Sequence, residues 1–373
     1  MTPPTVYVDN STLRSMARCS TEAIMRYHLH WTTDAEGAPL RAGSAVHAAL
    51  AAYLSGRTAD EALAVFDVEY RDWAREHLLD PGDRLAWRNV RLCVEQWFAT
   101  RSRGMLPFQV RPEHVEVGFA VPLTDDGVCS CGHPLDAHAE GVPVAGGDLA
   151  EGAGGCPVPS CACAAGAAVV FTGRIDAIAT ALDDQAWYLV EHKTTGMLTE
   201  PWFRAFHMNS QLSGYIWAAQ RHTRLPVIGA FLNAIELAKL PWDPKRKCAM
   251  HQTPYAECGA LHARSRLGVV QRSPDALVAW RRAALALATA YRTAQARVRQ
   301  SLARAGRLPQ EGTFSDACAW CTFHEWCRVG RPPAQVPVML VQRPWSPYDH
   351  AMAPRGLDAP PAAGAAAPPP VGA

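Results

Sequence analysis

Two acidic residues and a lysine are spaced so that a β-hairpin would bring them together. Asp176 lies on one strand-like segment, and Glu191 and Lys193 lie on the next. A turn centred on residues 183–184 would pair residues whose numbers sum to 367, so Asp176 would face Glu191 with Cβ atoms ~4.5–5.5 Å apart. Lys193 is two residues past Glu191 and would point to the same face.

This arrangement predicts metal-dependent chemistry. Two carboxylates so close repel each other unless a proton or a cation lies between them, and a hard divalent cation prefers oxygen ligands. A neighbouring lysine can orient a water molecule and neutralise charge on a phosphate, which suits metal-assisted hydrolysis of a phosphodiester. The alternative is a surface salt-bridge cluster on an edge hairpin, because a short D-x(14)-E-x-K pattern also arises by chance.

A second set of chemically competent residues is formed by cysteines near the two ends of the chain. The segment CAWCTFHEWC supplies three thiols, and Cys19 is the candidate for a fourth ligand, since a tetrahedral site needs four. The first residues, MTPPTVYVDN, have no basic region followed by an apolar run, so we expect a cytoplasmic protein in which disulfides are disfavoured. The three C-terminal thiols are Cys318, Cys321 and Cys327. Thiols at this spacing can bind zinc, an iron–sulfur cluster or no metal at all.

A third set lies in residues 124–167, a segment rich in Gly, Ala, Pro, Cys and His. We interpret it as an insertion that is too poor in apolar residues to fold unaided, so that a metal would organise it, and mixed thiolate and imidazole ligands suit Zn²⁺. The alternative is a flexible loop with adventitious cysteines. The selected ligands are Cys131, His138, Cys156 and Cys161, and the other candidates are Cys129, His133 and Cys163.

The surrounding pattern indicates an α/β protein. Hydrophobic residues make up 49% of the 373 residues and charged residues 19%, which excludes a disordered or fibrous chain, and no apolar stretch is long enough for a membrane span. We expect a mostly helical beginning, then strands and helices around the acidic residues. The expected helices span 11–28, 41–55, 59–78, 83–101, 208–222 and 273–304, and the expected strands span 113–123, 168–180, 186–193 and 227–237. Residues 239–262 are expected to be a loop.

Positive charge is concentrated in one late segment. Between Arg264 and Arg307 there are ten arginines and one acidic residue, Asp275, although the formal net charge of the whole chain is only +1. A basic stripe in a neutral protein suggests a polyanion partner, and a solvated helix face is the alternative. With ~100° per residue, three of the helical arginines fall on about one face and are the predicted DNA contacts: Arg281, Arg292 and Arg299.

Together these motifs resemble the PD-(D/E)XK nuclease superfamily, in particular its RecB-like and AddB-like iron–sulfur exonucleases, including the CRISPR-associated ones. GRIDAI followed by EHKTT is similar to the family's acidic core, RAGSAVHAAL to its upstream histidine motif, and QLSGYIWAA to its Q-x-x-x-Y motif. The pieces occur in family order from about Ser11 to Arg328. The resemblance implies a restriction-endonuclease-like core, a mixed sheet flanked by helices.

The resemblance also implies roles for individual residues. His47, Asp176 and Glu191 would hold Mg²⁺ or Mn²⁺ with help from the backbone carbonyl of His192, and Lys193 would position the attacking water. The two residues of the Q-x-x-x-Y motif, Gln211 and Tyr215, would steady Lys193 or contact the DNA backbone. Cys19 and the three C-terminal cysteines would hold a structural [4Fe–4S] cluster that joins the two ends of the chain.

The sequence therefore predicts a metal-dependent DNA nuclease, an exonuclease acting on DNA ends, with a setting in recombination, repair, phage DNA metabolism or CRISPR adaptation and with a helicase or recombination partner. A non-catalytic DNA-binding or scaffold protein and an iron–sulfur redox sensor are the alternatives. The expected organisation is a helical part at 1–110, a nuclease core and cluster segment at 111–335 containing the insertion, and a disordered Pro/Ala-rich tail at 336–373.

Overall fold

The computed structural model describes most of the chain and leaves several segments undescribed. The described residues are 5–33, 37–77, 80, 83–123, 169–237, 247, 252–253, 264–306, 308–309, 312, 315–332 and 335–353. Within these residues, no helix is both long and apolar enough to cross a membrane.

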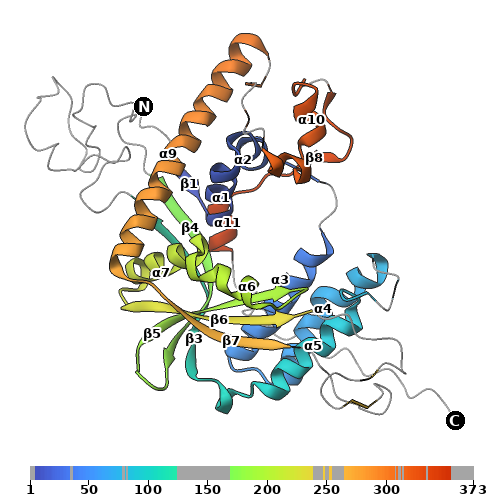
Figure 1. Ribbon diagram of the computed structural model, residues 1–373, viewed down its shortest axis with the longest axis vertical. Coiled ribbons are helices and arrows are strands. Elements are labelled where there is room, and N and C mark those ends of the chain that lie inside the picture. The colour runs from blue at the N-terminus through green and yellow to red at the C-terminus, as the bar shows by residue number, and fades with distance from the viewer. Residues whose placement is uncertain are drawn as a thin grey trace, which may run out of the picture.

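A six-stranded mixed sheet forms the centre of the molecule (Figure 1). The path is β1-β4-β5-β6-β7, and β3 pairs with β4. Strands β3, β4 and β5 form an antiparallel meander, whereas β6 runs parallel to β5 after a helical crossover. This is the mixed sheet flanked by helices that the sequence predicts. The strands are β1 (Val6–Val8), β3 (Phe108–Pro122), β4 (Val169–Ala181), β5 (Trp187–Thr195), β6 (Val227–Glu236) and β7 (Ser265–Gln271).

Helices cover both faces of the sheet and enclose two hydrophobic cores. One core joins the sheet to α1, α2, α7 and α9, and the other joins it to α3, α4 and α5. Because β1 is itself a strand of the sheet, the expected N-terminal helical part shares its cores with the nuclease part. The helices are α1 (Asn10–Arg18), α2 (Ser20–Tyr27), α3 (Ala38–Leu54), α4 (Ala59–His77), α5 (Trp87–Thr100), α6 (Glu200–Arg204), α7 (Ser210–Thr223) and α9 (Pro274–Ala305).

Local sequence sets where the longest helix begins and ends. Ser273 caps α9 by accepting a hydrogen bond from the backbone N–H of Ala276 at 3.2 Å, and Pro274 occupies the first turn. The helix ends at Gly306, whose φ of 62° is a left-handed conformation that glycine adopts without strain. Both ends agree with the sequence prediction.

The single helix expected over 11–28 is instead two helices. Cys19 separates α1 from α2 with an extended backbone (φ −160°), because its carbonyl and N–H serve as caps for the two flanking helices. Its thiol therefore lies at a helix junction rather than along a helix face.

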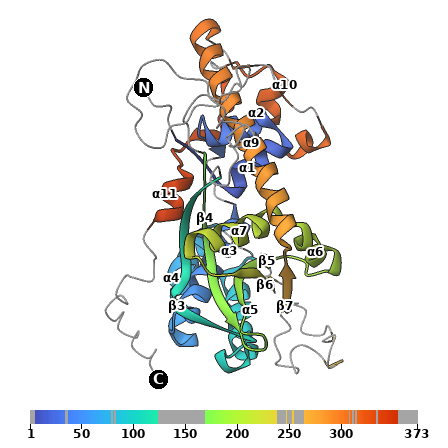
Figure 2. The ribbon, with the colours of Figure 1, turned by 90° about the vertical axis from the view of Figure 1, so that its left-hand side faces the viewer.

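The C-terminal segment also differs from the expectation of a disordered tail over 336–373. Strand β8 (Leu340–Gln342) pairs antiparallel with β2 (Trp31–Thr33), and α11 (Pro347–Met352) packs against β3 and β4. Figure 2 shows α11 beside these strands. The apolar and aromatic residues before Ala353 explain the difference, since the Pro- and Ala-rich composition begins after them.

Candidate active site

A cleft of about 580 Å³ opens between the sheet, α3, α7 and α11. It contains every residue that the sequence predicts for the cation and for catalysis. These residues are His47, Asp176, Glu191, Lys193, Gln211 and Tyr215.

Asp176 lies where β4 changes partners. β3 occupies one edge of β4, so β5 and β1 share the other edge: β5 pairs with residues 177–180 and β1 with residues 169–171. In every β4–β5 pair the two residue numbers sum to 367, which confirms the predicted register of this hairpin. Where the ladder ends, the backbone N–H of His192 donates to Asp176 Oδ2 at 2.7 Å. The carboxylate thus takes the place of a ladder partner.

His47 reaches Asp176 from α3. Its Nδ1 lies 3.2 Å from Asp176 Oδ1. Helix α3 can approach β5 closely because of Gly43, where an added Cβ would lie 3.3 Å from Thr194 Oγ1. Burial opposes the charged forms of both side chains, but the mutual attraction of imidazolium and carboxylate outweighs it, so the pKa of His47 is raised and that of Asp176 is lowered.

Buried Glu191 and partly buried Lys193 form an ion pair beside Asp176. Lys193 Nζ contacts Glu191 Oε1 and donates to Gln211 Oε1 at 3.1 Å. Gln211 therefore makes the contact with Lys193 that the resemblance implies, and Tyr215 lines the cleft one turn later. Burial raises the pKa of Glu191, whereas its carboxylate and that of Asp176 raise the pKa of Lys193 against the effect of burial.

The donor set fits a divalent cation. Glu191 Oε2 is buried and has no hydrogen-bond partner, although leaving a carboxylate oxygen unsatisfied is costly. Two carboxylates and an imidazole border the cleft at this point, and carboxylate oxygens are preferred ligands of Mg²⁺ and Mn²⁺. In the described part of the chain, no three His, Cys, Asp or Glu side chains are placed so that they could hold a metal ion together, so binding would require side-chain adjustment.

Glu116 is a cleft residue that the sequence interpretation missed. It lies on β3 between the pairs Val115–Ala177 and Val117–Ile175, hence opposite Asp176, with a left-handed φ of 53°. Burial, followed by repulsion from Asp176, raises the pKa of Glu116 to about 7, although Arg174 lies 3.6 Å away. The β3–β4 register is irregular between residues 110 and 115, so the position of Glu116 opposite Asp176 cannot be predicted by counting residues along the sequence.

The sequence interpretation also missed a buried hydrogen-bond network formed by the side chains of His192, Asn233 and Trp97. His192 Nδ1 lies 2.8 Å from Asn233 Nδ2, and Asn233 Oδ1 accepts from Trp97 Nε1 at 2.9 Å. Burial lowers the pKa of His192 to about 4, so its ring is neutral. The ring also meets that of His47 edge to face, with centroids 5.8 Å apart. This network fixes the strand segment that carries Glu191 and Lys193.

The four terminal cysteines line one cavity of about 270 Å³ between α1, α2 and α10 (His324–Arg328). None of the four is in a disulfide. Burial raises the pKa of Cys321 and Cys327, which favours the protonated thiol form of both side chains. Cys19, Cys318, Cys321 and Cys327 thus border the same cavity, although no three of them in this described region are arranged as a group that could hold a metal ion.

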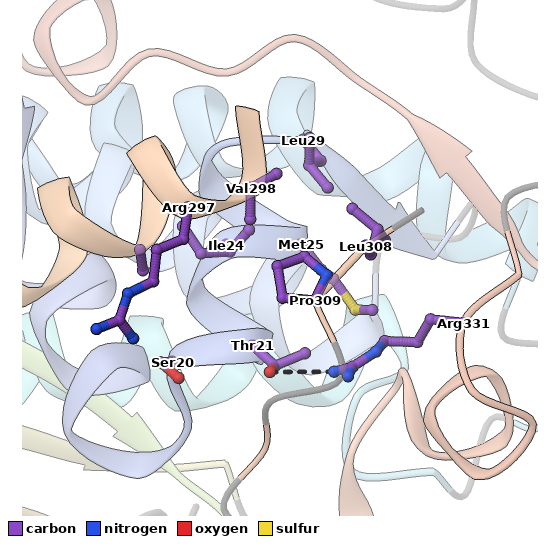
Figure 3. Close-up of a pocket in the computed structure, with 11 residues that line it drawn as sticks. Ser20, Thr21, Ile24, Met25, Leu29, Arg297, Val298, Leu308, Pro309 and Arg331 are labelled. Carbon is purple, nitrogen blue, oxygen red and sulfur yellow. Dashed lines mark hydrogen bonds between the residues drawn. The ribbon is translucent and has the colours of Figure 1, made fainter. Parts of the chain in front are cut away.

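Other contacts hold the same chain ends together. Arg331 is buried and donates to Thr21 Oγ1 at 3.1 Å, beside a small cavity between α2 and α9 that Figure 3 shows. That cavity has a volume of about 30 Å³, enough for one or two water molecules but not for an organic ligand. It is a packing feature of the junction between α2, α9 and the cluster segment.

The arginines predicted to contact DNA do not share one environment. Arg281 is only 8% exposed, and its Nε donates to the carbonyl of Leu123 at 2.9 Å. The expectation that it faces a DNA backbone is therefore wrong, because its position on α9 points into the core at the end of β3. Arg292 is half-buried and Arg299 is exposed. All zinc candidates lie outside the described residues.

The mixed sheet and the cleft with its His, Asp, Glu and Lys side chains agree with the fold of a metal-dependent nuclease. The model of the PD-(D/E)XK nuclease superfamily matches residues 10–328, and the chain belongs to this superfamily. Comparison with curated proteins gives no match.

Proposed function

We propose that the protein is a Mg²⁺- or Mn²⁺-dependent deoxyribonuclease that hydrolyses phosphodiester bonds at DNA ends. The observation that supports this most is the buried, unpartnered Glu191 Oε2 in a cleft that also contains Asp176, His47 and Lys193. In a non-catalytic scaffold, the free-energy cost of burying this unsatisfied carboxylate oxygen would have no functional compensation.

In this proposal His47, Asp176 and Glu191 hold the cation. The cation would supply Lewis-acid activation of the scissile phosphate and of the attacking water. Lys193, whose ammonium is positioned by its hydrogen bond to Gln211, stabilises the negative charge that builds up on the phosphate. The hydrogen bond from His192 keeps one oxygen of Asp176 fixed and leaves the other toward His47.

We also propose that the four gathered cysteines hold a structural [4Fe–4S] cluster. Three come from residues 318–327 and one from the junction of α1 and α2, so the cluster would connect segments almost 300 residues apart. Closing so long a loop stabilises the folded chain. Arg18 and Arg328 line the cavity and would offset the negative charge of a thiolate-bound cluster.

For the DNA path, Arg292 and Arg299 on α9 remain proposed contacts, with Arg281 removed from the set. Contacts of this kind bind phosphates and read no bases. The action on ends, the link to recombination, repair or phage DNA metabolism and a helicase partner rest on the family resemblance. Zn²⁺ binding by residues in 124–167 likewise stays a prediction.

The test is a digestion assay on end-labelled single- and double-stranded DNA with protein purified without oxygen, in Mg²⁺, in Mn²⁺ and in EDTA. We expect cation-dependent cleavage that disappears in Asp176→Ala and Glu191→Ala. A closed circular substrate separates endonuclease from exonuclease action. Absence of cleavage by the wild-type protein with either cation would overturn the proposal.

A further inference from the structure

The C-terminal helix α11 forms part of the wall of the active-site cleft. Pro347 and His350 line the same cleft as Asp176, Glu191 and Lys193. Helix α11 lies beyond residue 328, where the match to the superfamily model ends. The match therefore does not include this element of the cleft.

Arg174 fixes the end of α11 onto the sheet. Its guanidinium donates from Nη2 to the carbonyls of His350, Ala351 and Ala353 at 3.1, 3.2 and 2.6 Å. Carbonyls in the last turn of a helix have no partner within the helix, so one cation satisfies three of them. Arg174 precedes Asp176 by two residues on β4, which ties α11 to the strand that bears the catalytic carboxylate.

The backbone of β3 is in close contact with the same helix. At Gly118, an added Cβ would lie 2.2 Å from the carbonyl oxygen of Ala351, so only glycine permits this approach. The start of α11 is also held, because Ser346 Oγ accepts from the backbone N–H of Asp349 at 3.2 Å and the ring of Tyr348 lies 4.8 Å from that of Tyr7. Figure 2 shows the helix alongside β3. A six-residue helix is thus anchored at both ends.

We propose that α11 is a substrate-positioning wall and that His350 binds a phosphate of the DNA strand next to the scissile bond. The proposal rests on the nuclease function proposed above. His350 is exposed and lines the cleft, and an imidazole N–H can donate to a phosphate oxygen. Lys193 and Arg174 are held by partners within the protein, whereas His350 is an exposed residue of the cleft lining, with its ring centroid 6.4 Å from that of Trp345.

Two variants test the wall by different routes. His350→Ala removes the proposed contact from an exposed position, where folding is not at risk. Gly118→Ala removes no cleft side chain but forces α11, with its cleft residues Pro347 and His350, away from β3. The matched controls are His207→Ala, which removes an exposed histidine outside the cleft, and Gly104→Ala, where no atom lies within 4 Å of the added Cβ.

The measurements are fluorescence anisotropy of a fluorescein-labelled single-stranded oligonucleotide in Ca²⁺ and steady-state cleavage of it in Mn²⁺. We expect His350→Ala and Gly118→Ala to raise Kd and KM about 5- to 10-fold while kcat changes less than about 2-fold, and His350→Gln to recover part of the affinity. The controls should match wild type.

Three outcomes would contradict these proposals. If the wild-type protein cleaves DNA and both variants keep its Kd and KM, α11 has only a structural role and the wall proposal fails. If the wild-type protein itself does not cleave, the nuclease proposal fails. Equal loss of kcat and affinity in His350→Ala, without recovery in His350→Gln, would also contradict a binding role.

Discussion

The backbone N–H of His192 donates a 2.7 Å hydrogen bond to Asp176 Oδ2. His192 lies between Glu191 and Lys193, so this bond links the carboxylate of β4 to the middle of the motif on β5. Both strands leave their common ladder at this point, and the carboxylate replaces the missing strand partner. The geometry of the site therefore depends on a few bonds at a gap in the sheet, and single substitutions there should separate catalysis from folding.

Replacing Lys193 with Ala should lower the rate of DNA cleavage by at least about 10²–10³-fold, because charge that develops on the phosphate loses its partner. DNA binding in Ca²⁺ and the far-UV circular dichroism spectrum should change little. Lys247→Ala is the matched control, an exposed lysine far along the chain from the motif. Near-normal cleavage by Lys193→Ala would refute the catalytic role assigned to this residue.

Glu116 should make stability depend on pH in a defined direction. Its pKa of about 7 in the folded protein exceeds the ordinary value of 4.5, so folding takes up a proton between these values and stability is lost as the pH rises through them. Glu116→Gln removes this loss. In EDTA, the variant should be more stable than wild type by about 1–3 kcal/mol at pH 8 and by little at pH 4.5.

Urea denaturation at the two pH values measures this difference. Exposed Glu76 on α4 supplies the control, Glu76→Gln, which should show no such change with pH. Added Mn²⁺ should reduce the gain of Glu116→Gln at pH 8, since a cation beside Asp176 favours the ionised form of Glu116. A stability difference that is the same at both pH values would contradict a raised pKa.

The candidate site could largely be predicted from the sequence, in part because local rules determine the pairing of β4 and β5. The register of a hairpin follows from its turn, so the pairing sum of 367 placed Asp176 opposite Glu191. Gln211 and Tyr215 follow from the resemblance to the Q-x-x-x-Y motif, and their spacing of four residues places both on one face of α7. By contrast, Glu116 could not be placed, because an irregular register interrupts the β3–β4 ladder and no turn within the described residues fixes the distance along the chain.

The sequence predictions that were wrong share one physical cause, which is their dependence on tertiary contacts. The position of Arg281 depends on which face of α9 packs on the sheet, and its guanidinium reaches a backbone carbonyl at the end of β3. Helix α11 and strand β8 are short, and their stability comes from contacts with β2, β3 and β4 rather than from local propensity. Tertiary contacts of this kind leave no signal in the local composition.

Arg281 should contribute to stability rather than to DNA affinity. Arg281→Ala leaves the Leu123 carbonyl without this donor and creates a cavity beside α9, so unfolding free energy should fall by about 2–4 kcal/mol. Kd for DNA and its salt dependence should stay within error of wild type, as measured by anisotropy below the melting temperature. The adjacent, exposed Arg282 provides the control Arg282→Ala. A flatter salt dependence in Arg281→Ala with unchanged stability would restore its role as a DNA contact.

The terminal cysteines yield a prediction that does not depend on cleavage. Protein isolated without oxygen should be brown and contain about four irons per chain. Cys19→Ser should lose the colour and most of the iron, because the fourth corner of the cluster then lacks a thiolate, even though Cys19 is almost 300 residues from its partners in sequence. Its melting temperature should also fall, since the link between the chain ends is lost. Iron analysis and visible absorption measure the first effect, and calorimetry measures the second.

Cys93→Ser is the matched control, because Cys93 is buried against α4 and the sheet in the other core and does not line the cysteine cavity. This variant should keep its iron even where it loses some stability, which separates loss of a ligand from loss of packing. Zinc in place of iron, at one ion per chain and lost in Cys19→Ser, would keep the four-cysteine site but replace the cluster. Full iron content in Cys19→Ser would remove Cys19 from the ligand set. The junction of α1 and α2 would then supply no ligand to the metal.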